Sequence, residues 1–343
     1  MTSPKKSAAA VSLSIVIPAI GDTAALEDTL VSVLENRPDD CEVVVPLGCP
    51  YDDPWGIRDE VRFVQAPVGS GLVTCTNLGI ASSAGSVVHV LAAGWRATPG
   101  WTDSAVAHFA DDSVAAVVPL GVSADDQDRV VSAGIRVTRG GRRMAVVPRG
   151  NAAADRVDVS KLRPSGPALE AGFWRADVLA AIGPGFASCC GGLLADADMA
   201  NAIASLDRTV VVDADSRVVW GTPRPSSNSF QAGLHAERLF WRSLARGSIV
   251  SALVPHAVEI CRDAVARAPF ATLPMLVGRL IGSLQFGSAM ARIRELRGLR
   301  RDGIAGLEDP ATESPTLRID AGHADAFRPR QRSSEPTPLR RSA

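Results

Sequence analysis

The chain has 343 residues, enough for one large α/β domain with an appendage or for two ordinary domains. Lysine and arginine together number 36, against 37 acidic residues, so no net field attracts nucleic acid and we expect no nucleic-acid partner. The six cysteines show no paired spacing apart from the adjacent Cys189 and Cys190, which argues against a disulfide scaffold and against a zinc module.

Both ends of the chain are expected to be disordered. The leader, 1–11, has two lysines and is followed by an apolar stretch too short and too broken for a signal peptide. The tail, 302–343, is rich in Pro, Ser and Arg and poor in apolar residues. No apolar run reaches the roughly 20 residues of a membrane span, and unpaired thiols are typical of a reducing compartment. We therefore expect a cytoplasmic protein.

Residues 12–222 are predicted to form one α/β domain with a mainly parallel, doubly wound sheet. Apolar runs rich in β-branched residues show no polar alternation and are separated by amphipathic stretches. This pattern is typical of strands in a sheet whose two faces are covered by helices. The expected strands are 13–19, 41–47, 61–67, 86–92, 113–120 and 209–215; the expected helices are 22–36, 72–83, 99–109 and 195–206; and a hairpin is expected around Gly140 and Gly141.

Residues 223–301 are predicted to form a helical C-terminal segment. Two sets of apolar residues recur at helical spacing, namely Ile249, Leu253, Ala257 and Ile260, and then Leu276, Leu280 and Leu284. The apolar run 270–287 is broken by polar residues and by Pro274, so it is not a membrane span. Together with the arginine-rich end, it indicates either helices packed back on the sheet or helices lying on an anionic membrane surface.

Five segments, taken in order and spacing, resemble those of family 2 glycosyltransferases, which have the A-type, nucleotide-sugar-binding fold. The segments are 13–36, 41–50, 69–95, 176–186 and 193–203. The resemblance covers roughly residues 12–222. It implies transfer of a sugar from a nucleotide-sugar donor to an acceptor hydroxyl with inversion, and the helices that follow resemble those with which some members approach lipid-linked acceptors. A glycan or a lipid-linked acceptor is therefore expected.

The motifs that carry the donor and its metal in this family are degenerate here. The Asp-x-Asp motif, whose carboxylates hold the divalent cation, falls on Ala92, Ala93 and Gly94. The Asp-Asp-Gly-Ser motif falls on 47–50, which read Leu-Gly-Cys-Pro. The family implies Mg²⁺ or Mn²⁺, ions that prefer carboxylate oxygens, but the usual ligands are missing. We expect no metal ligand and no requirement for a divalent cation.

One acidic motif of the family survives. Its Glu-Asp-x-Asp falls on 195–198, where Ala195 replaces the Glu while Asp196 and Asp198 remain. The resemblance implies that Asp196 is the base that takes the acceptor proton, so that Asp196→Asn should abolish transfer, and that Asp198 lies at the substrate. The alternative is that both are helix-start acids that the helix dipole favours, with no catalytic role.

Four further residues are candidates for binding substrate, each beside a structural alternative. Asn77 survives from the family's Arg-Asn-x-Gly motif, whose Arg is replaced by a threonine. Arg96 follows the degenerate metal motif and would contact phosphate in the metal's stead, or else is a solvated loop residue. Asp52 would reach the ribose or form a turn, and Trp95 would stack on a sugar or serve in packing. His89 lies in an apolar run and is read as a satisfied core histidine.

Two other functions stay open on the sequence alone. A fold that has lost donor chemistry would be a pseudoenzyme, a catalytically inactive module that binds a carbohydrate or a protein partner. A nucleotidyl transferase on the same fold would need the metal-binding carboxylates that are absent. A dinucleotide-binding dehydrogenase is disfavoured because the run 69–74 is an imperfect Gly-x-Gly-x-x-Gly with no acid about 20 residues on.

Overall fold

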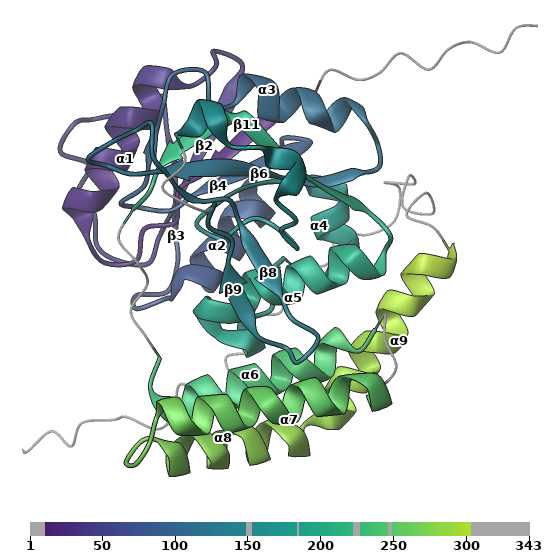
Figure 1. Ribbon diagram of the computed structural model, residues 1–343. Helices are drawn as coiled ribbons and strands as arrows, with labels where there is room; N and C mark the ends of the chain where they lie inside the picture. Colours follow the sequence, from purple (N-terminus) through teal and green to yellow (C-terminus); the bar gives the residue numbers. More distant parts are fainter. Residues whose placement is uncertain (1–10, 149–152, 184, 222–226, 246–248, 303–343) are drawn as a thin grey trace, which may run out of the picture. The chain divides into compact units, whose positions relative to one another are not determined.

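The computed structural model describes residues 11–148, 153–183, 185–221, 227–245 and 249–302 (Figure 1). The described residues belong to one compact unit. Apart from their inner ends, the predicted leader and tail lie outside the described residues. No helix within the described ranges is long and apolar enough to cross a bilayer.

The fold is built on a nine-stranded sheet in the order β3-β2-β1-β4-β10-β6-β11-β5, with β7 paired to β6. The strands are β1 (Leu13–Val16), β2 (Cys41–Leu47), β3 (Arg62–Gln65), β4 (Val87–Leu91), β5 (Arg96–Ala97), β6 (Val114–Val122), β7 (Val130–Ser132), β10 (Ala171–Arg175) and β11 (Thr209–Val219). Strands β1, β2 and β4 are largely buried, as their unbroken apolar runs predicted. The predicted α/β class is confirmed.

The sheet is mixed because β10 runs antiparallel to both of its neighbours, β4 and β6. Strands β1 to β4 are parallel to one another, as are β6 and β11. Beyond β6 the chain makes the predicted hairpin of β8 (Ile135–Val137) and β9 (Arg143–Ala145). It re-enters the sheet at Ala171, opposite Leu91 at the carboxyl end of β4. Because the chain returns at the same edge of the sheet at which β6 ends, β10 must run antiparallel to β4 and β6.

Five helices belong to this α/β region: α1 (Thr23–Asn36), α2 (Leu72–Ser82), α3 (Asp103–Ala107), α4 (Ala176–Ile182) and α5 (Gly191–Ser205). Helix α1 begins at its expected N-cap, since the Asp22 carboxylate accepts a hydrogen bond of 3.1 Å from the Ala25 amide. Helix α2 lies close against β1 because Gly79 has no side chain; a Cβ there would meet Val16 Cγ1 at 2.3 Å. Helix α5 carries Asp196 and Asp198.

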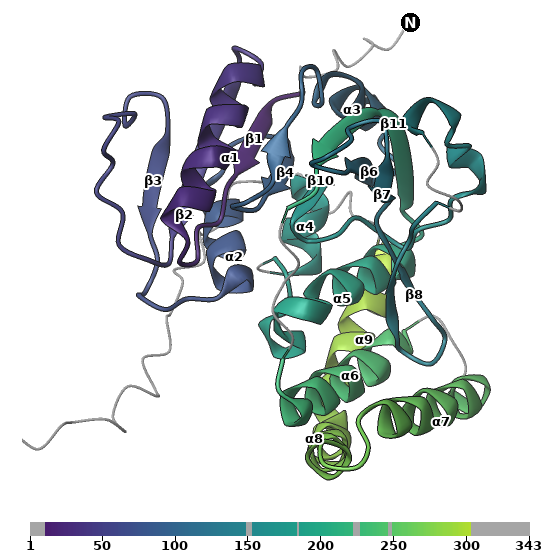
Figure 2. The ribbon, with the colours of Figure 1, turned by 60° about the vertical axis from the view of Figure 1, so that its left-hand side comes forward.

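Four helices follow: α6 (Ser229–Ser243), α7 (Ile249–Ala266), α8 (Thr272–Leu284) and α9 (Phe286–Asp302). Figures 1 and 2 both show α6 between α5 and α8. Helices α6 and α8 approach closely through glycines, because a Cβ on Gly233 would lie 2.1 Å from the Met275 carbonyl oxygen, and one on Gly278 equally close to that of Phe230. The C-terminal segment thus packs on the α/β region. This was one of the two arrangements that the sequence indicated.

Helices α7 and α8 nevertheless pack with their polar sides inward. His256 of α7 and Arg279 of α8 are buried, whereas Leu253 and Leu280, assigned from the sequence to apolar faces, are 45% and 62% exposed. We define the outer apolar face as eleven of the exposed apolar residues of the two helices: Val250, Leu253, Val254, Val258 and Val265 of α7, and Leu273, Leu276, Val277, Leu280, Ile281 and Leu284 of α8. The apolar periodicity was predicted correctly, but it marks the outside of the bundle.

Candidate functional site

The carboxyl edge of the parallel strands is the part of an α/β sheet where ligands usually bind. At this edge, backbone hydrogen bonds fix the segment that follows β4. Ala92 N–H donates to the Glu170 carbonyl oxygen at 2.8 Å, and Gly94 N–H donates to Thr29 Oγ1 at 2.9 Å. Ala92, Ala93 and Gly94 have no side-chain ligand for a metal. The described residues contain no group of three His, Cys, Asp or Glu side chains placed to hold an ion. The donor set therefore does not fit a divalent cation.

A cavity of about 200 Å³, which we call the edge cavity, lies beside this segment. Trp95 follows the bare motif directly and lines the cavity together with Trp220, and their ring centroids are 4.5 Å apart. Among the described residues that line it, Glu170 supplies a carboxylate and Arg143 a guanidinium. The cavity is smaller than the roughly 300 Å³ at which drug-sized ligand sites begin. It therefore suits part of a larger ligand, such as its reacting groups, rather than a whole nucleotide sugar.

Arg143 forms a bidentate ion pair with Asp196. Its Nε lies 2.9 Å from Oδ1 and its Nη2 lies 2.7 Å from Oδ2 of the carboxylate. The Asp196 side chain is fully buried, while that of Arg143 is 23% exposed. The amide of Leu169, the residue before Glu170, also donates to Asp196 Oδ2, at 3.3 Å. The predicted catalytic base is thus enclosed behind Arg143, and its role as base stays a prediction.

The second surviving acid, Asp198, is paired with Arg242 of α6 through bonds of 2.6 and 2.7 Å. Arg242 and Arg238 lie near Cys189, which is exposed, whereas Cys190 is buried. A hydrogen bond with Cys190, opposed by burial and reinforced by Arg242, lowers the pKa of the Cys189 thiol. The same hydrogen bond and burial raise the pKa of Cys190. Asp198 is thus a link between α5 and α6, and Cys189 is a thiol with thiolate character.

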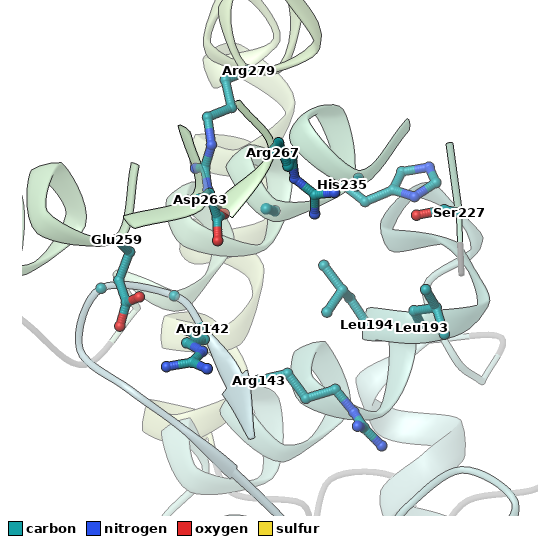
Figure 3. A pocket seen from close by; sticks show the side chains of 14 residues that line it. Arg142, Arg143, Leu193, Leu194, Ser227, His235, Glu259, Asp263, Arg267 and Arg279 are labelled. Atoms are coloured by element: carbon teal, nitrogen blue, oxygen red, sulfur yellow. Dashed lines mark hydrogen bonds and ion pairs between the residues drawn. The ribbon is translucent and has the colours of Figure 1, made fainter. Parts of the chain in front are cut away.

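A second cavity, of about 270 Å³, lies between the β8–β9 hairpin and helices α5 to α8 (Figure 3). It meets the edge cavity at Arg143 and Leu193, which line both. In Figure 3 the neighbouring side chains Arg142 and Arg143 point to different sides of the hairpin. Arg279 lines this cavity and donates to Asp263 at 2.6 Å.

Behind the second cavity lies a buried polar network centred on Glu237 of α6. Its carboxylate is 3.0 Å from His256 Nε2, 3.1 Å from Arg279 Nη1 and 2.9 Å from Ser283 Oγ. Burial raises the pKa of Glu237, but the hydrogen bonds from His256 and Ser283 and the charge of Arg279 outweigh it, and the pKa is lowered. This network explains why the polar side of α7 faces inward.

Three other predicted binding residues lie apart from the edge cavity's lining. The Asn77 amide donates to the Phe186 carbonyl at 2.8 Å and accepts from the Phe186 amide at 2.7 Å, so it holds the loop before α5. Arg96 is exposed on β5, and Asp52 is exposed in the loop after β2. Of the candidates, only Trp95 lines the edge cavity, while Asp196 lies directly behind it. The binding roles of Asn77, Arg96, Asp52 and Asp198 stay predictions.

His89 is the satisfied core histidine that the sequence indicated. Its ring is fully buried and stacks on Phe173, with centroids 3.8 Å apart. Trp101 Nε1 donates to its Nε2 at 3.1 Å, so its Nδ1 carries the proton and donates to the Gly172 carbonyl at 3.0 Å. Burial lowers the pKa of His89 to about 3, against which the bond to Gly172 acts only weakly. The imidazole is therefore neutral at physiological pH.

Sequence reasoning did not single out Glu170, Arg143 or Trp220. Glu170 is the one charged residue in the run 167–174 and comes directly before β10. Arg143 was placed in the hairpin, 53 residues before its partner Asp196. The signal that could have found Glu170 is a carboxylate immediately before a buried strand, at the edge where a ligand binds. Arg143 had no such local signal.

No family model matches this sequence, and no curated protein matches it either. Solved structures do resemble it. The mannosyltransferase PcManGT from Pyrobaculum calidifontis, solved with GDP-Man and Mn²⁺, aligns over 86% of this chain and 88% of its own, with 17% identity and a TM-score of 0.51. TarS of S. aureus, solved alone and with UDP-GlcNAc, aligns over 86% and 92%, with 14% identity and a TM-score of 0.53.

GalNAc-T7, solved with UDP, GalNAc and Mn²⁺, aligns over 68% of this chain and 47% of its own, with 15% identity and a TM-score of 0.50. The first is named as a mannosyltransferase, and all three were solved with a nucleotide or a nucleotide sugar. At these identities the likeness concerns the fold. The chain has the A-type glycosyltransferase fold that the sequence resemblance implied, with a helical C-terminal region.

Proposed function

We propose that this protein is a family 2-like glycosyltransferase that moves a sugar from a nucleotide-sugar donor to an acceptor hydroxyl at the edge cavity. The observation that carries the proposal is that one carboxylate, Glu170, and one guanidinium, Arg143, line the same cavity at the carboxyl edge of an A-type sheet. The GDP-Man and UDP-GlcNAc of the similar structures support a nucleotide sugar as the donor class.

Glu170 is the base of the proposed reaction. A general base must come within hydrogen-bond reach of the proton that it takes. Glu170 lines the cavity, whereas the Asp196 carboxylate is fully buried and engaged by Arg143. A hydroxyl in the edge cavity therefore lies on the side of the cavity wall that Glu170 lines, whereas the Asp196 carboxylate lies behind Arg143. Asp196, the base that the sequence predicts, is the competing assignment, and comparing the turnover of Glu170→Gln with that of Asp196→Asn distinguishes the two.

The proposed transfer is a single displacement with inversion. The acceptor oxygen bonds to the anomeric carbon as the bond from that carbon to the diphosphate oxygen breaks, and Glu170 takes the hydroxyl proton. Trp220, which is partly exposed, offers an apolar ring surface to a sugar in the cavity, and the buried Trp95 packs against it. The donor set at Ala92, Ala93 and Gly94 does not fit a divalent cation, so no step of this mechanism is assigned to one.

A catalytically inactive module is the second candidate function. The observation that favours it is that the segments after β2 and β4, where the family carries its acidic motifs, have Leu-Gly-Cys-Pro and Ala-Ala-Gly instead. Such a module would bind a carbohydrate in the edge cavity without breaking the donor bond.

We also propose that the outer apolar face lies on a membrane surface, where the acceptor is found. The eleven apolar residues of the outer apolar face are exposed, and a soluble monomer rarely exposes so many together. The acids of this segment, Glu259 and Asp263, are 15% and 28% exposed at their side chains, while Arg262 is 41% exposed. An anionic bilayer therefore meets little repulsion here, and a lipid-linked acceptor fits this placement.

The test is release of nucleoside diphosphate from a panel of UDP-, GDP- and dTDP-sugars, assayed with and without glycan and lipid-phosphate acceptors. Release with formation of a product of inverted anomeric configuration, read by NMR, supports the transferase. Binding of a sugar nucleotide or glycan without any release, by protein shown to be folded, supports the inactive module instead.

A further inference from the structure

We propose that Arg143 provides the positive charge that stabilises the diphosphate leaving group in the edge cavity, and that Asp196 is the positioning residue that holds Arg143 there. The inference rests on the function proposed above. Two proteins of similar fold were solved with a nucleotide or nucleotide sugar and Mn²⁺. The described residues at this edge of the present protein, in contrast, do not fit a divalent cation.

In the part of the chain that the structure describes, one nitrogen of the Arg143 guanidinium is left for a ligand. Its Nε and Nη2 are both used by the carboxylate of Asp196. Among the described residues Nη1 has no hydrogen-bond partner, and the side chain is 23% exposed where it lines the edge cavity. A phosphate oxygen in that cavity would accept from Nη1 in a charge-assisted hydrogen bond.

The position of Arg143 is fixed from two directions. Its strand β9 pairs with β8, where Arg143 lies opposite Val137, and the hairpin tip contacts the rest of the protein through Gly140 and Gly141. A Cβ on Gly141 would lie 2.9 Å from Phe240 Cβ of α6, so the tip lies directly against that helix. Preorganised charge of this kind costs no rearrangement when negative charge develops on a leaving group.

The buried ion pair is better explained by this role than by stability. Removing two charges from water is costly, so a buried pair is often no more stabilising than apolar residues of similar size. What the pair does provide is a single orientation of the guanidinium. Asp196 also accepts from the amide of Leu169, so the same carboxylate holds the backbone directly before Glu170.

The other arginines near this edge are less suited to the role. Arg96, for which the sequence suggested contact with phosphate, is exposed on the short edge strand β5 and does not line the edge cavity. Arg142 points to a different side of the hairpin from Arg143 (Figure 3). Arg143 is the one cation among the described residues that line the edge cavity.

In the proposed step, the bond between the anomeric carbon and the diphosphate oxygen breaks, and its electron pair goes to that oxygen. The acceptor oxygen forms the new bond to carbon, and its proton goes to the Glu170 carboxylate. The added negative charge on the diphosphate is met by Arg143, which stays protonated throughout.

The experiment is calorimetric titration of the full chain with UDP, GDP and dTDP and with their nucleosides, in the presence of EDTA and again with Mn²⁺. The variant is Arg143→Gln combined with Asp196→Asn, which removes the charge without leaving a buried unpaired carboxylate. Arg142→Gln is the matched control, because it removes a neighbouring arginine of the same hairpin. Circular dichroism and thermal melts establish that each protein is folded.

We expect at least one diphosphate to bind the wild type in EDTA, with no tightening by Mn²⁺. The double variant should bind that diphosphate about 10- to 100-fold more weakly, as expected for one charge-assisted hydrogen bond, yet bind the nucleoside equally well. Arg142→Gln should match the wild type. A purely structural role for Arg143 would not separate diphosphate from nucleoside.

Unchanged diphosphate binding by the folded double variant, or wild-type binding that requires Mn²⁺, overturns the inference and leaves the proposed function standing. Failure of the folded wild type to bind any of the three diphosphates under either condition overturns the proposed function, and the inference with it.

Discussion

His256 of α7 and Glu237 of α6 share a hydrogen bond of 3.0 Å in the interior of the helical region. Because these polar groups face inward, the apolar side of α7 faces outward, and Val254 is 72% exposed. Burying one such side chain in a bilayer interface is worth about 1.5 to 3 kcal/mol. The outer apolar face is therefore expected to determine whether the protein binds to a membrane surface.

The first prediction concerns membrane binding. Val254→Glu combined with Leu280→Glu should reduce co-sedimentation with phosphatidylcholine–phosphatidylglycerol vesicles at least about tenfold, since both side chains are lost from the interface. Val68→Glu is the control, because Val68 is 80% exposed but lies outside this face. Equal sedimentation of the double variant and the wild type would refute membrane docking. Self-association that only the double variant abolishes, seen by analytical ultracentrifugation, would also count against a membrane partner and favour a second copy.

The second prediction concerns the network around Glu237. Glu237→Ala leaves Arg279 and His256 buried without their shared acceptor, so the free energy of unfolding should fall by about 3 to 5 kcal/mol. Glu295→Ala removes another glutamate paired with an arginine, but Glu295 is 54% exposed and the loss should stay below about 1 kcal/mol. Urea unfolding of the three proteins measures both effects. Equal losses would show that the buried network contributes no more than a surface pair.

The third prediction follows from His89. Its folded pKa of about 3 is below the unfolded value of 6.5, so below pH 6.5 the unfolded chain binds a proton that the folded protein excludes. The associated stability is complete above pH 6.5 and is lost as the pH falls towards 3. Between about pH 6.5 and pH 5 the loss is about 2 kcal/mol, at 1.36 kcal/mol per unit.

His89→Gln should flatten this part of the stability profile in urea titrations at several pH values. His108→Gln, at a histidine whose side chain is 38% exposed, should keep the wild-type slope. If His89→Gln and the wild type lose stability in parallel between these pH values, His89 does not stay neutral in the way the structure requires.

The fourth prediction concerns thiol reactivity. The hydrogen bond with Cys190, followed by the charges of Arg242 and Arg238, lowers the pKa of Cys189, and the thiolate is the nucleophilic form. At neutral pH, iodoacetamide should alkylate Cys189 faster than Cys261, which is also exposed, as read by peptide mass spectrometry. Cys190→Ala should slow the reaction of Cys189 towards that of Cys261. Equal rates for the two thiols in the wild type would contradict the assignment.

Much of the sheet could be predicted because its strands follow local rules. The buried strands β1, β2 and β4 are unbroken apolar runs, and the hairpin has Gly140 and Gly141 at its turn. The direction of β10 could not be predicted in this way, since it depends on the edge at which the chain returns at Ala171. The inward orientation of the polar side of α7 could not be predicted either, because periodicity identifies an apolar face but does not show whether that face is buried.

The candidate site was predictable only where the family pattern survives. Asp196 was found from its motif, but its partner Arg143 lies 53 residues away in the β8–β9 hairpin, and no local pattern joins them. Glu170 precedes a buried strand without any motif. Trp95 was found because it follows the degenerate segment after β4, and it does line the edge cavity.

The identity of the base is the most direct test of the account. The measurement is the turnover number for nucleotide-sugar cleavage by the wild type, Glu170→Gln and Asp196→Asn, each shown by calorimetry to bind the donor. We expect Glu170→Gln to lose at least about 100-fold in turnover with donor binding retained, and Asp196→Asn to keep measurable turnover with weaker donor binding. Full turnover by Glu170→Gln, with loss of turnover but not of binding in Asp196→Asn, would contradict the account and restore Asp196 as the base.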